Sequence, residues 1–401
     1  MDLVIEGKFY IDGEVKDTCV GIEDGKIVTI GRLVRGGDER IDLGGRLILP
    51  GFVDPHVHFR EPGLTQKEDF ASGTLSALYG GVTGILDMPN TRPPSTDYRS
   101  LMEKKALVRG KAYVDYGLFA ALTPDAEIEK MAPAAAGFKL FMGSTTGNIL
   151  MNDDEEISYL MGDIARSGKV LSVHAEDDSM IGRDTEHDNW DHLRNRPLEA
   201  EHNAVRRLAR YKGMKINICH VTDAGTLDMA ASCGFTTEVT MHHMLFCAED
   251  VSGTEYKVNP PIRDRRIRDS LVKAVMAGKV HMFGTDHAPH TFDDKAAGSP
   301  GFTGLETSYG VCNKVLVHEF GLYEKHLSQL MSANPARILG LTKGLFKTGY
   351  DADLTLVDPE EEWIVDSSNF YSRGKATPFE GETLIGKVHT VFIGGRKVFE
   401  V

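Results

Sequence analysis

Eight short apolar runs that alternate with helical stretches constrain the fold of this chain more than any other feature. The runs are GFVDPHVHF (51–59), GVTGILDMPNT (81–91), VDYGLFAAL (114–122), GFKLFMG (137–143), VLSVHAED (170–177), INICHVT (216–222), TEVTMHHML (237–245) and VHMFGTDHAPH (280–290). Stretches with helical periodicity, such as residues 67–81 and 266–279, fall between them. Eight strand–helix units within residues 50–344 favour an α/β fold of the (β/α)8 TIM-barrel type, with a doubly wound open sheet as the alternative.

The two ends of the chain share a different pattern, in which short alternating strands are separated by Asp-Gly and Gly-Gly turns. The pattern covers residues 1–49 and returns in residues 345–401. Such alternation is typical of antiparallel strands. Because each end alone has too few strands for a stable sandwich, we expect both to pair into one small β-sandwich domain. The barrel would then span residues 50–344, and the two termini would lie close together.

Charge and cysteine usage exclude some classes of protein. The formal net charge of −14 leaves no basic surplus to neutralise phosphates, which argues against nucleic acid as a partner. No segment approaches the roughly 18 continuous apolar residues of a membrane span, and the first residues lack the basic start of a signal peptide. The five cysteines are scattered and form no CxxC pair, which favours reduced thiols and a cytoplasmic location.

Polar residues suited to metal binding stand at the ends of five of the eight runs. They are His56, His58, Lys139, His174, His220 and Asp286. In a barrel the carboxyl ends of the strands meet at one mouth, so we expect these side chains to converge there. Imidazole and carboxylate groups suit zinc and related divalent ions. Four histidines and an aspartate exceed the needs of one ordinary zinc site, so the set indicates a two-metal centre bridged by an anion.

Lys139 is the unusual member of this set because apolar residues flank it on both sides. A lysine buried there as a free cation would be costly. Carboxylation of its amine by CO2 would turn it into a carbamate anion that can bridge two cations, which we treat as a hypothesis. The alternative is an ordinary lysine that reaches solvent or forms a salt bridge.

Other histidines and a cysteine have less specific interpretations. Three histidines in a charged, helix-like region are expected on the surface: His187, His192 and His202. His242 and His243 end the seventh run, where they could support metal ligands or simply pack. Cys219 and Glu238 could hold a further metal ion, although a small apolar cysteine and a paired acid are the simpler interpretation.

Several motifs together resemble those of dihydroorotases, within the cyclic amidohydrolase superfamily. In chain order they are DPHVHFREPG, DMPNT, GFKLFMG, VHAED, ICHVT, NPPIR and GTDHAPH. The resemblance covers essentially the whole chain. The HxH strand indicates only the superfamily, whereas Arg60 and Asn90 point to dihydroorotase within it.

The resemblance implies a role for each site residue. His56 and His58 would bind the more buried of two zinc ions with Asp286, and His174 and His220 would bind the second. An N6-carboxylated Lys139 would bridge the two ions. The substrate-binding residues would be Arg60, Asn90, Asn259 and His290. A metal-activated hydroxide would then interconvert L-dihydroorotate and N-carbamoyl-L-aspartate in pyrimidine biosynthesis, with Asp286 carrying the proton.

Three alternatives stay open at this point. Allantoinases and hydantoinases or dihydropyrimidinases share the metals and the lysine, but their substrates lack the ring carboxylate that Arg60 and Asn90 would bind. A non-catalytic, dihydroorotase-like scaffold would have lost metal ligands, and all six are present here.

The sequence leaves open whether the chain associates with copies of itself or with another pyrimidine-pathway enzyme. The loop MGSTTGN (142–148) could close over a small-molecule substrate or be an ordinary connection.

Overall fold

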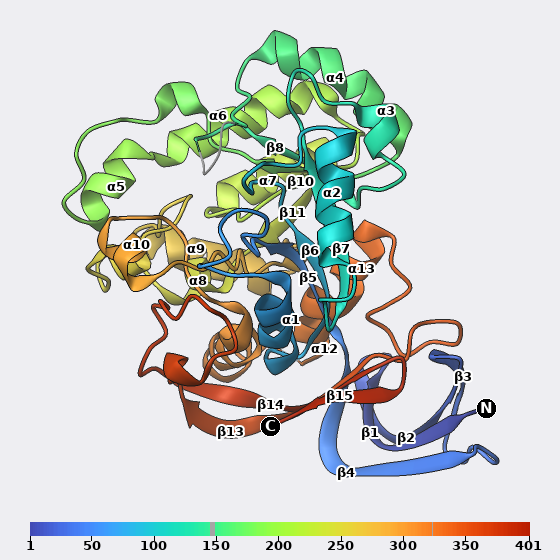
Figure 1. The fold of residues 1–401 in the computed structure, drawn as a ribbon. Helices are drawn as coiled ribbons and strands as arrows, with labels where there is room; N and C mark the ends of the chain where they lie inside the picture. Colours follow the sequence, from blue (N-terminus) through green and yellow to red (C-terminus); the bar gives the residue numbers. More distant parts are fainter. Residues whose placement is uncertain (145–148, 323) are drawn as a thin grey trace.

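A computed structural model describes residues 1–144, 149–322 and 324–401 and shows a barrel beside a separate mixed sheet (Figure 1). The barrel strands are β5 (Phe52–Val57), β6 (Val82–Asp87), β7 (Asp115–Ala121), β8 (Gly137–Phe141), β9 (Leu171–His174), β10 (Ile216–Ile218), β11 (Thr236–Val239) and β12 (Met282–Phe283). Each of the eight predicted runs overlaps one of these strands. Four residues of the glycine-rich loop, 145–148, lie outside the described residues, so its expected role stays a prediction.

Hydrogen bonding decides between a barrel and an open sheet. The eight strands pair in parallel in the order of the chain, from β5 to β12. The first strand, β5, also meets the segment that follows the last strand, β12. Val57 forms a β-bridge with His287, and the His58 amide donates to the His287 carbonyl at 2.8 Å. The sheet therefore closes on itself, and the prediction of a (β/α)8 barrel is confirmed.

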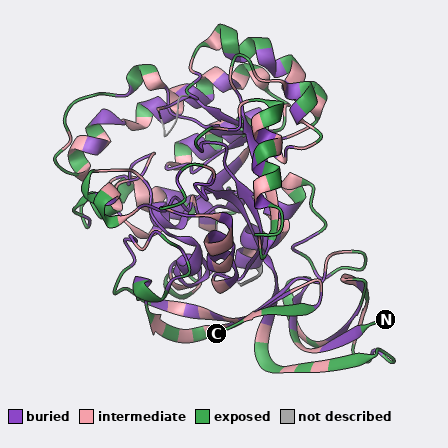
Figure 2. Cartoon of the chain, in the orientation of Figure 1, coloured by how far each residue is buried: buried purple, intermediate pink, exposed green. Residues whose placement is uncertain are grey.

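Helices surround the barrel and bury their inner faces against it (Figures 1 and 2). They are α1 (Phe70–Tyr79), α2 (Tyr98–Val108), α3 (Ile128–Met131), α4 (Asp154–Ser167), α5 (Asn189–Asn195), α6 (Leu198–Leu208), α7 (Ala224–Cys233), α8 (Met241–Leu245), α9 (Arg265–Met276), α10 (Phe292–Ala296), α11 (Ser308–Cys312), α12 (Glu324–Ser328) and α13 (Asn334–Leu339). Among the described residues, no helix combines the length and the apolar character that crossing a membrane requires.

Aspartate side chains fix the start of many of these helices. Asp69 accepts from the Ser72 amide at 2.9 Å, and Asp223 accepts from the Gly225 amide at 2.7 Å. The same type of cap begins α2, α4 and α9. Each cap satisfies an otherwise unpaired amide and contributes about 1 kcal/mol. Capping thus helps to fix where each strand-to-helix loop ends, and these loops carry much of the site described below.

The two ends of the chain form one seven-stranded sheet in the order β15-β14-β13-β4-β1-β2-β3. Its strands are β1 (Leu3–Ile11), β2 (Glu14–Glu23), β3 (Lys26–Gly31), β4 (Glu39–Pro50), β13 (Leu354–Ile364), β14 (Thr383–Ile393) and β15 (Arg396–Glu400). The N-terminal β4 pairs antiparallel with the C-terminal β13, from Leu354 opposite Pro50 to Val357 opposite Leu47. The predicted pairing of the two ends is therefore present. Phe9, Ile48 and Phe392 belong to its core.

Candidate metal-binding active site

One pocket at the carboxyl ends of the barrel strands collects nearly all the residues singled out from the sequence. It is lined by His56, His58, Arg60, Asn90, Lys139, Phe141, His174, His220, Asn259, Asp286, Ala288, Pro300 and Gly301. His290 does not line the pocket but contacts Arg60 at its edge, with Nε2 at 3.1 Å from Nη2. Residues separated by more than 200 positions thus meet at the barrel mouth, as expected for this fold.

His56 and His58 present their Nε2 atoms to the same carboxylate. Asp286 Oδ1 lies 3.4 Å from His56 Nε2 and 3.0 Å from His58 Nε2. The other ring nitrogen of each histidine is hydrogen-bonded on the side away from Asp286. His56 Nδ1 lies 2.7 Å from Glu238, and His58 Nδ1 lies 2.6 Å from Asn90 Oδ1. Such outer hydrogen bonds fix the ring orientation of metal-binding histidines. Asn90, expected to bind substrate, therefore also orients His58.

The charges in this corner favour a bound cation. Burial and Lys139 act to lower the pKa of His56, but Glu238 and Asp286 outweigh them and raise it to about 10. Burial lowers the pKa of His58 to about 4, although Asp286 opposes the shift. The carboxylates thus hold a positive charge on one ring of the pair, at a place where a divalent cation could replace the proton.

His174 and His220 form a second histidine pair. His174 Nδ1 lies 3.0 Å from His220 Nε2, and His174 Nε2 donates to Glu176 at 2.8 Å. Burial lowers the pKa of both imidazoles, so both rings are neutral. Since Glu176 takes the His174 hydrogen on Nε2, Nδ1 has a lone pair that faces the other ring. Two neutral imidazoles directed at one another in this way suit a shared metal ion.

Lys139 is buried in the middle of β8, close enough to both histidine pairs to affect their charge. Its Nζ lies 3.5 Å from His56 Nε2 and 3.0 Å from Cys219 Sγ. The side chain is 0% exposed, so it does not reach solvent, and no acid of the described residues forms an ion pair with it. Neither ordinary interpretation of this lysine fits its surroundings.

Two groups of described residues have ligand atoms close enough together to hold a metal ion. They are His56, His58 and Asp286, and His56, Cys219 and Glu238. The first group has the imidazole and carboxylate donors typical of zinc sites and faces the pocket. In the second, Glu238 is hydrogen-bonded to His56, so it already acts as a paired acid.

Strained backbone marks the same residues. Of the five non-glycine residues with positive φ in the described chain, Asp12 and Asp24 lie in tight turns next to strands. The other three are Arg60 (φ 60°), His220 (φ 37°) and Asp286 (φ 50°). Such conformations cost of order 1 kcal/mol each and persist where the surrounding structure enforces them, often at functional sites.

The opposite side of the pocket is built to receive an anion. Arg60 is 3% exposed, and its Nε donates to the Pro289 carbonyl at 3.2 Å. Burial lowers the pKa of Arg60 to about 10, which still leaves a cation near neutral pH. Among the described acids none forms an ion pair with it. Lys67 Nζ lies 3.1 Å from His290 Nδ1, but it is paired with Asp294 at 2.9 Å, so Arg60 is the cation that lacks an acidic partner here.

A larger cavity adjoins this pocket. Its volume is about 560 Å³, and Asn259 and Pro300 line both spaces. Asn259 Oδ1 is buried and has no hydrogen-bond partner among the described residues. This oxygen therefore remains free to accept a hydrogen bond from a ligand at the junction of the two spaces.

The structure corrects one of the histidine predictions. His192 is buried rather than exposed, because its two ring nitrogens contact Glu186 at 2.9 Å and the Val258 carbonyl at 2.9 Å. His187 is exposed and His202 is half-buried. His242 and His243 are buried in α8 and do not line the pocket.

Three polar residues were missed or left open by the sequence. His243 Nε2 donates to the Pro260 carbonyl at 3.0 Å and so supports the segment next to Asn259. Glu176, two residues after His174 in VHAED, and Lys67, seven residues after Arg60, were not singled out. Glu176 could have been found as a carboxylate two residues after a candidate ligand, and Lys67 as a charged residue at the start of a predicted helix.

Comparisons with known proteins agree with this geometry. A family model described as the amidohydrolase family matches residues 47–398. A dihydroorotase from Pyrococcus furiosus is 36% identical over 412 residues, covering 100% of this chain and 93% of that protein. An allantoinase from Rubrobacter xylanophilus is 35% identical and covers 100% of this chain and 94% of its own. The solved structure of an L-hydantoinase (dihydropyrimidinase) from Arthrobacter aurescens matches with a TM-score of 0.92 at 26% identity, covering 100% of this chain and 96% of that one. This chain belongs to the amidohydrolase family.

Proposed function

We propose that the protein is a dihydroorotase, which interconverts N-carbamoyl-L-aspartate and L-dihydroorotate in pyrimidine biosynthesis. The observation that carries the proposal is Arg60, a buried guanidinium without an acidic partner among the described residues, beside a set of metal ligands. A planar guanidinium is suited to bind a carboxylate through two hydrogen bonds. L-Dihydroorotate carries such a group, whereas allantoin and dihydrouracil do not. Full-length relatives that are named dihydroorotase support the assignment.

The donors present fit a binuclear zinc centre. His56, His58 and Asp286 would hold one ion, His174 and His220 would hold the other, and a carboxylated Lys139 would bridge them. When bound, two zinc ions lower the pKa of a water molecule and polarise the carbonyl that it attacks. The buried position of Lys139, without an acidic partner among the described residues, supports the carbamate, because an anionic side chain there would suit two cations better than an ammonium would.

The chain's own residues would bind the substrate and move the proton. Arg60 would hold the substrate carboxylate, and Asn259 would accept a hydrogen bond with its free Oδ1. Asp286 lies on the inner side of the pocket beside His56 and His58. Its carboxylate would accept a proton from the attacking water and return it to the ring nitrogen that leaves. The five buried, unpaired cysteines support a cytoplasmic location for this chemistry.

A direct comparison of substrates tests the proposed function. Purified protein with zinc is assayed for hydrolysis of L-dihydroorotate, allantoin and dihydrouracil under the same conditions. The expected result is turnover of L-dihydroorotate in clear preference to both neutral rings. Preference for a neutral ring would overturn the assignment, and the allantoinase relative makes allantoin the strongest competitor.

Mass spectrometry tests the bridge separately. Native mass spectra of the zinc-loaded protein should show the added mass of one CO2 together with two zinc ions. The Lys139→Met variant should lack the CO2 and retain fewer ions. An unmodified Lys139 in a protein that is active with two zinc ions would exclude the carbamate. Absence of both zinc and activity would instead favour a non-catalytic scaffold.

A further inference from the structure

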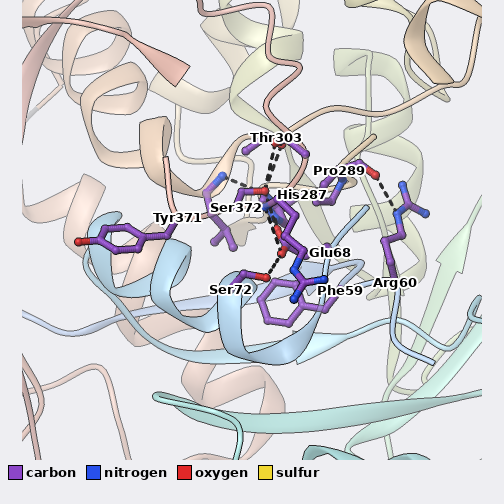
Figure 3. A network of polar contacts seen from close by, with 12 residues as sticks. Phe59, Arg60, Glu68, Ser72, His287, Pro289, Thr303, Tyr371 and Ser372 are labelled. Atoms are coloured by element: carbon purple, nitrogen blue, oxygen red, sulfur yellow. Dashed lines mark hydrogen bonds and ion pairs between the residues drawn. The ribbon is translucent and has the colours of Figure 1, made fainter. Parts of the chain in front are cut away.

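A segment near the C-terminus crosses from the terminal sheet to the substrate side of the pocket. It consists of residues 370–377, here called the strap, and lies in the red loop between β13 and β14 in Figure 1. No strap residue lines the pocket. Its polar contacts nevertheless go to two loops, one after β5 and one after β12, which carry Arg60 and Pro289 (Figure 3). His290 follows Pro289 in the second loop.

Glu68 is the centre of the contacts with the first loop. It is fully buried and accepts a hydrogen bond from Ser372 Oγ at 2.5 Å. The Arg373 amide donates to its other oxygen at 3.4 Å, and Ser72 of α1 donates to that oxygen as well. A buried carboxylate needs such donors, because an unmet acceptor in the interior is costly. The strap therefore supplies part of what keeps Glu68, and the loop around it, in place.

Glu68 also faces the second loop. His287 Nδ1 accepts from the Gly304 amide at 3.2 Å, so the ring hydrogen lies on Nε2. His287 Nε2 points toward Glu68 at 3.5 Å (Figure 3). His287 follows Asp286 and precedes Pro289 and His290 by two and three residues. The buried Glu68 carboxylate, which belongs to the first loop, thus accepts hydrogen bonds from the strap and lies next to His287 of the second loop.

Gly374 makes the closest approach to the second loop. A Cβ atom at this position would lie 2.6 Å from Pro289 Cβ, 2.8 Å from the His290 nitrogen and 2.9 Å from the His290 oxygen. The Pro289 carbonyl accepts from Arg60 Nε, and the His290 ring contacts Arg60 Nη2. The strap backbone therefore packs directly on Pro289, whose carbonyl holds Arg60 Nε, and on His290, whose ring lies against Arg60 Nη2.

Further bonds hold the strap itself. The Thr303 amide donates to the Ala376 carbonyl at 3.0 Å, and Thr377 Oγ1 donates to the Thr303 carbonyl at 2.8 Å. Arg373 Nη1 donates to the Thr65 carbonyl at 2.8 Å, and Nη2 lies 2.5 Å from Asp69. The strap is thus tied at several points along its length, which allows it to act as a support rather than a loose tail.

We infer that the strap positions Arg60 and His290 and so sets the preference of the site for a substrate with a carboxylate. This inference rests on the proposed function, because it assigns Arg60 to a substrate carboxylate. The strap residues are positioning residues: Ser372 acts through Glu68 and Gly374 acts through Pro289 and His290. Among the described residues, the polar contacts of the strap do not include the metal-ligand candidates, so substrate binding should depend on the strap more than metal binding does.

Gly374→Ala is the sharper test, because the added methyl group must displace the backbone at His290. Relative to the parent protein, the KM for L-dihydroorotate should rise about tenfold while kcat changes by less than about threefold. Zinc content should be unchanged. Gly45→Ala is the matched control, since Gly45 is exposed in β4 and a Cβ there meets nothing within 4 Å. Equal losses for L-dihydroorotate and dihydrouracil would overturn the inference, because a merely structural role affects both substrates alike.

Ser372→Ala is the milder test and serves if Gly374→Ala does not fold. It should raise the KM for L-dihydroorotate about threefold to tenfold and lower the preference over dihydrouracil. Ser368→Ala is its control, because Ser368 lies just before the strap and is exposed. Among the described residues, its side chain hydrogen-bonds to Asp366 and makes no such bond to the strap. A KM and a preference equal to those of the parent would overturn the inference.

Hydrogen exchange separates failure of this inference from failure of the proposed function. In Ser372→Ala, amides of residues 60–69 and 286–290 should exchange faster than in Ser368→Ala, whatever the substrate is. If the parent protein does not hydrolyse L-dihydroorotate, the proposed function fails while faster exchange still supports the strap as a support for Arg60. Unchanged exchange in both segments would overturn the strap even in an active dihydroorotase.

Discussion

The two sides of the pocket are built from different parts of the fold. The metal side stands on strands of the barrel or within a few residues after them. His56, Lys139 and His174 lie in β5, β8 and β9, and the residues that follow β5, β10 and β12 are His58, His220 and Asp286. The anion side stands on loops, where Arg60 is held by Pro289 and His290. Because barrel strands are shared by the whole fold and loops vary, we propose that the chemistry resides in the scaffold and substrate choice in the loops.

The partners of the two sides differ in charge as well. Carboxylates support the metal side, with Glu238 behind His56 and Glu176 behind His174. Arg60, in contrast, contacts a backbone carbonyl and a neutral imidazole, because burial and Arg60 itself lower the pKa of His290 to about 2. The metal side is therefore prepared for cations, and the anion side keeps a positive charge that a ligand can neutralise.

The largest effect is expected from Asp286, the carboxylate shared by His56 and His58. Asp286→Asn should lower kcat by about 10³-fold, because the amide cannot accept and return the proton. Steady-state rates with saturating zinc provide the measurement. Asp269→Asn, a half-exposed aspartate of α9, is the control and should leave kcat unchanged. A kcat within tenfold of the parent for Asp286→Asn would remove the proton-transfer role from this residue.

Removing the acids behind the histidines tests whether the metal side depends on its carboxylates. Glu176→Gln and Glu238→Gln should each weaken zinc binding about 10-fold to 100-fold, since each loses a charge that orients a ligand ring. Zinc affinity is measured by competition with a chelator. Neither change should alter the KM for L-dihydroorotate once zinc is saturating. A raised KM with normal zinc affinity would mean that these acids act on the anion side instead.

The smallest effect concerns an acid next to the strap. Burial raises the pKa of Glu306 from 4.5 to about 8, and its carboxyl accepts from the Tyr371 amide. A raised pKa means that its stabilising contribution is complete below pH 4.5 and is lost as the pH rises toward 8. Glu306→Gln should therefore lose less stability than the parent protein when the pH of denaturant unfolding is raised from 5 to 9. An identical pH dependence in both proteins would show that Glu306 is ionised throughout.

Much of the metal side could be predicted from the sequence because its signal is local. Each ligand candidate follows a short apolar run, and a barrel brings all strand ends to one mouth, so convergence required no knowledge of side-chain contacts. Arg60 was identifiable only through the resemblance to dihydroorotases, as the residue two positions after His58. The pairing of the two chain ends followed from matching strand patterns.

The supports of the anion side could not be predicted in this way. Ser372, Arg373 and Gly374 look like ordinary loop residues, and their importance depends on Glu68 and His290, which are distant in the sequence. His192 was assigned to the surface because its neighbours are charged, yet Glu186 and a backbone carbonyl satisfy its ring in the interior. Local polarity does not reveal whether a polar side chain finds partners inside the protein.

The difference between the two sides is tested most directly by removing the Arg60 charge and comparing two rings. The measurement is kcat/KM for L-dihydroorotate and for dihydrouracil in the parent protein and in Arg60→Met, with zinc content determined for both. Loss of a carboxylate contact should lower the value for L-dihydroorotate about 100-fold or more, while the value for dihydrouracil and the zinc content change little. A parallel fall for both rings, or an unchanged ratio, would contradict the assignment of substrate choice to the anion side.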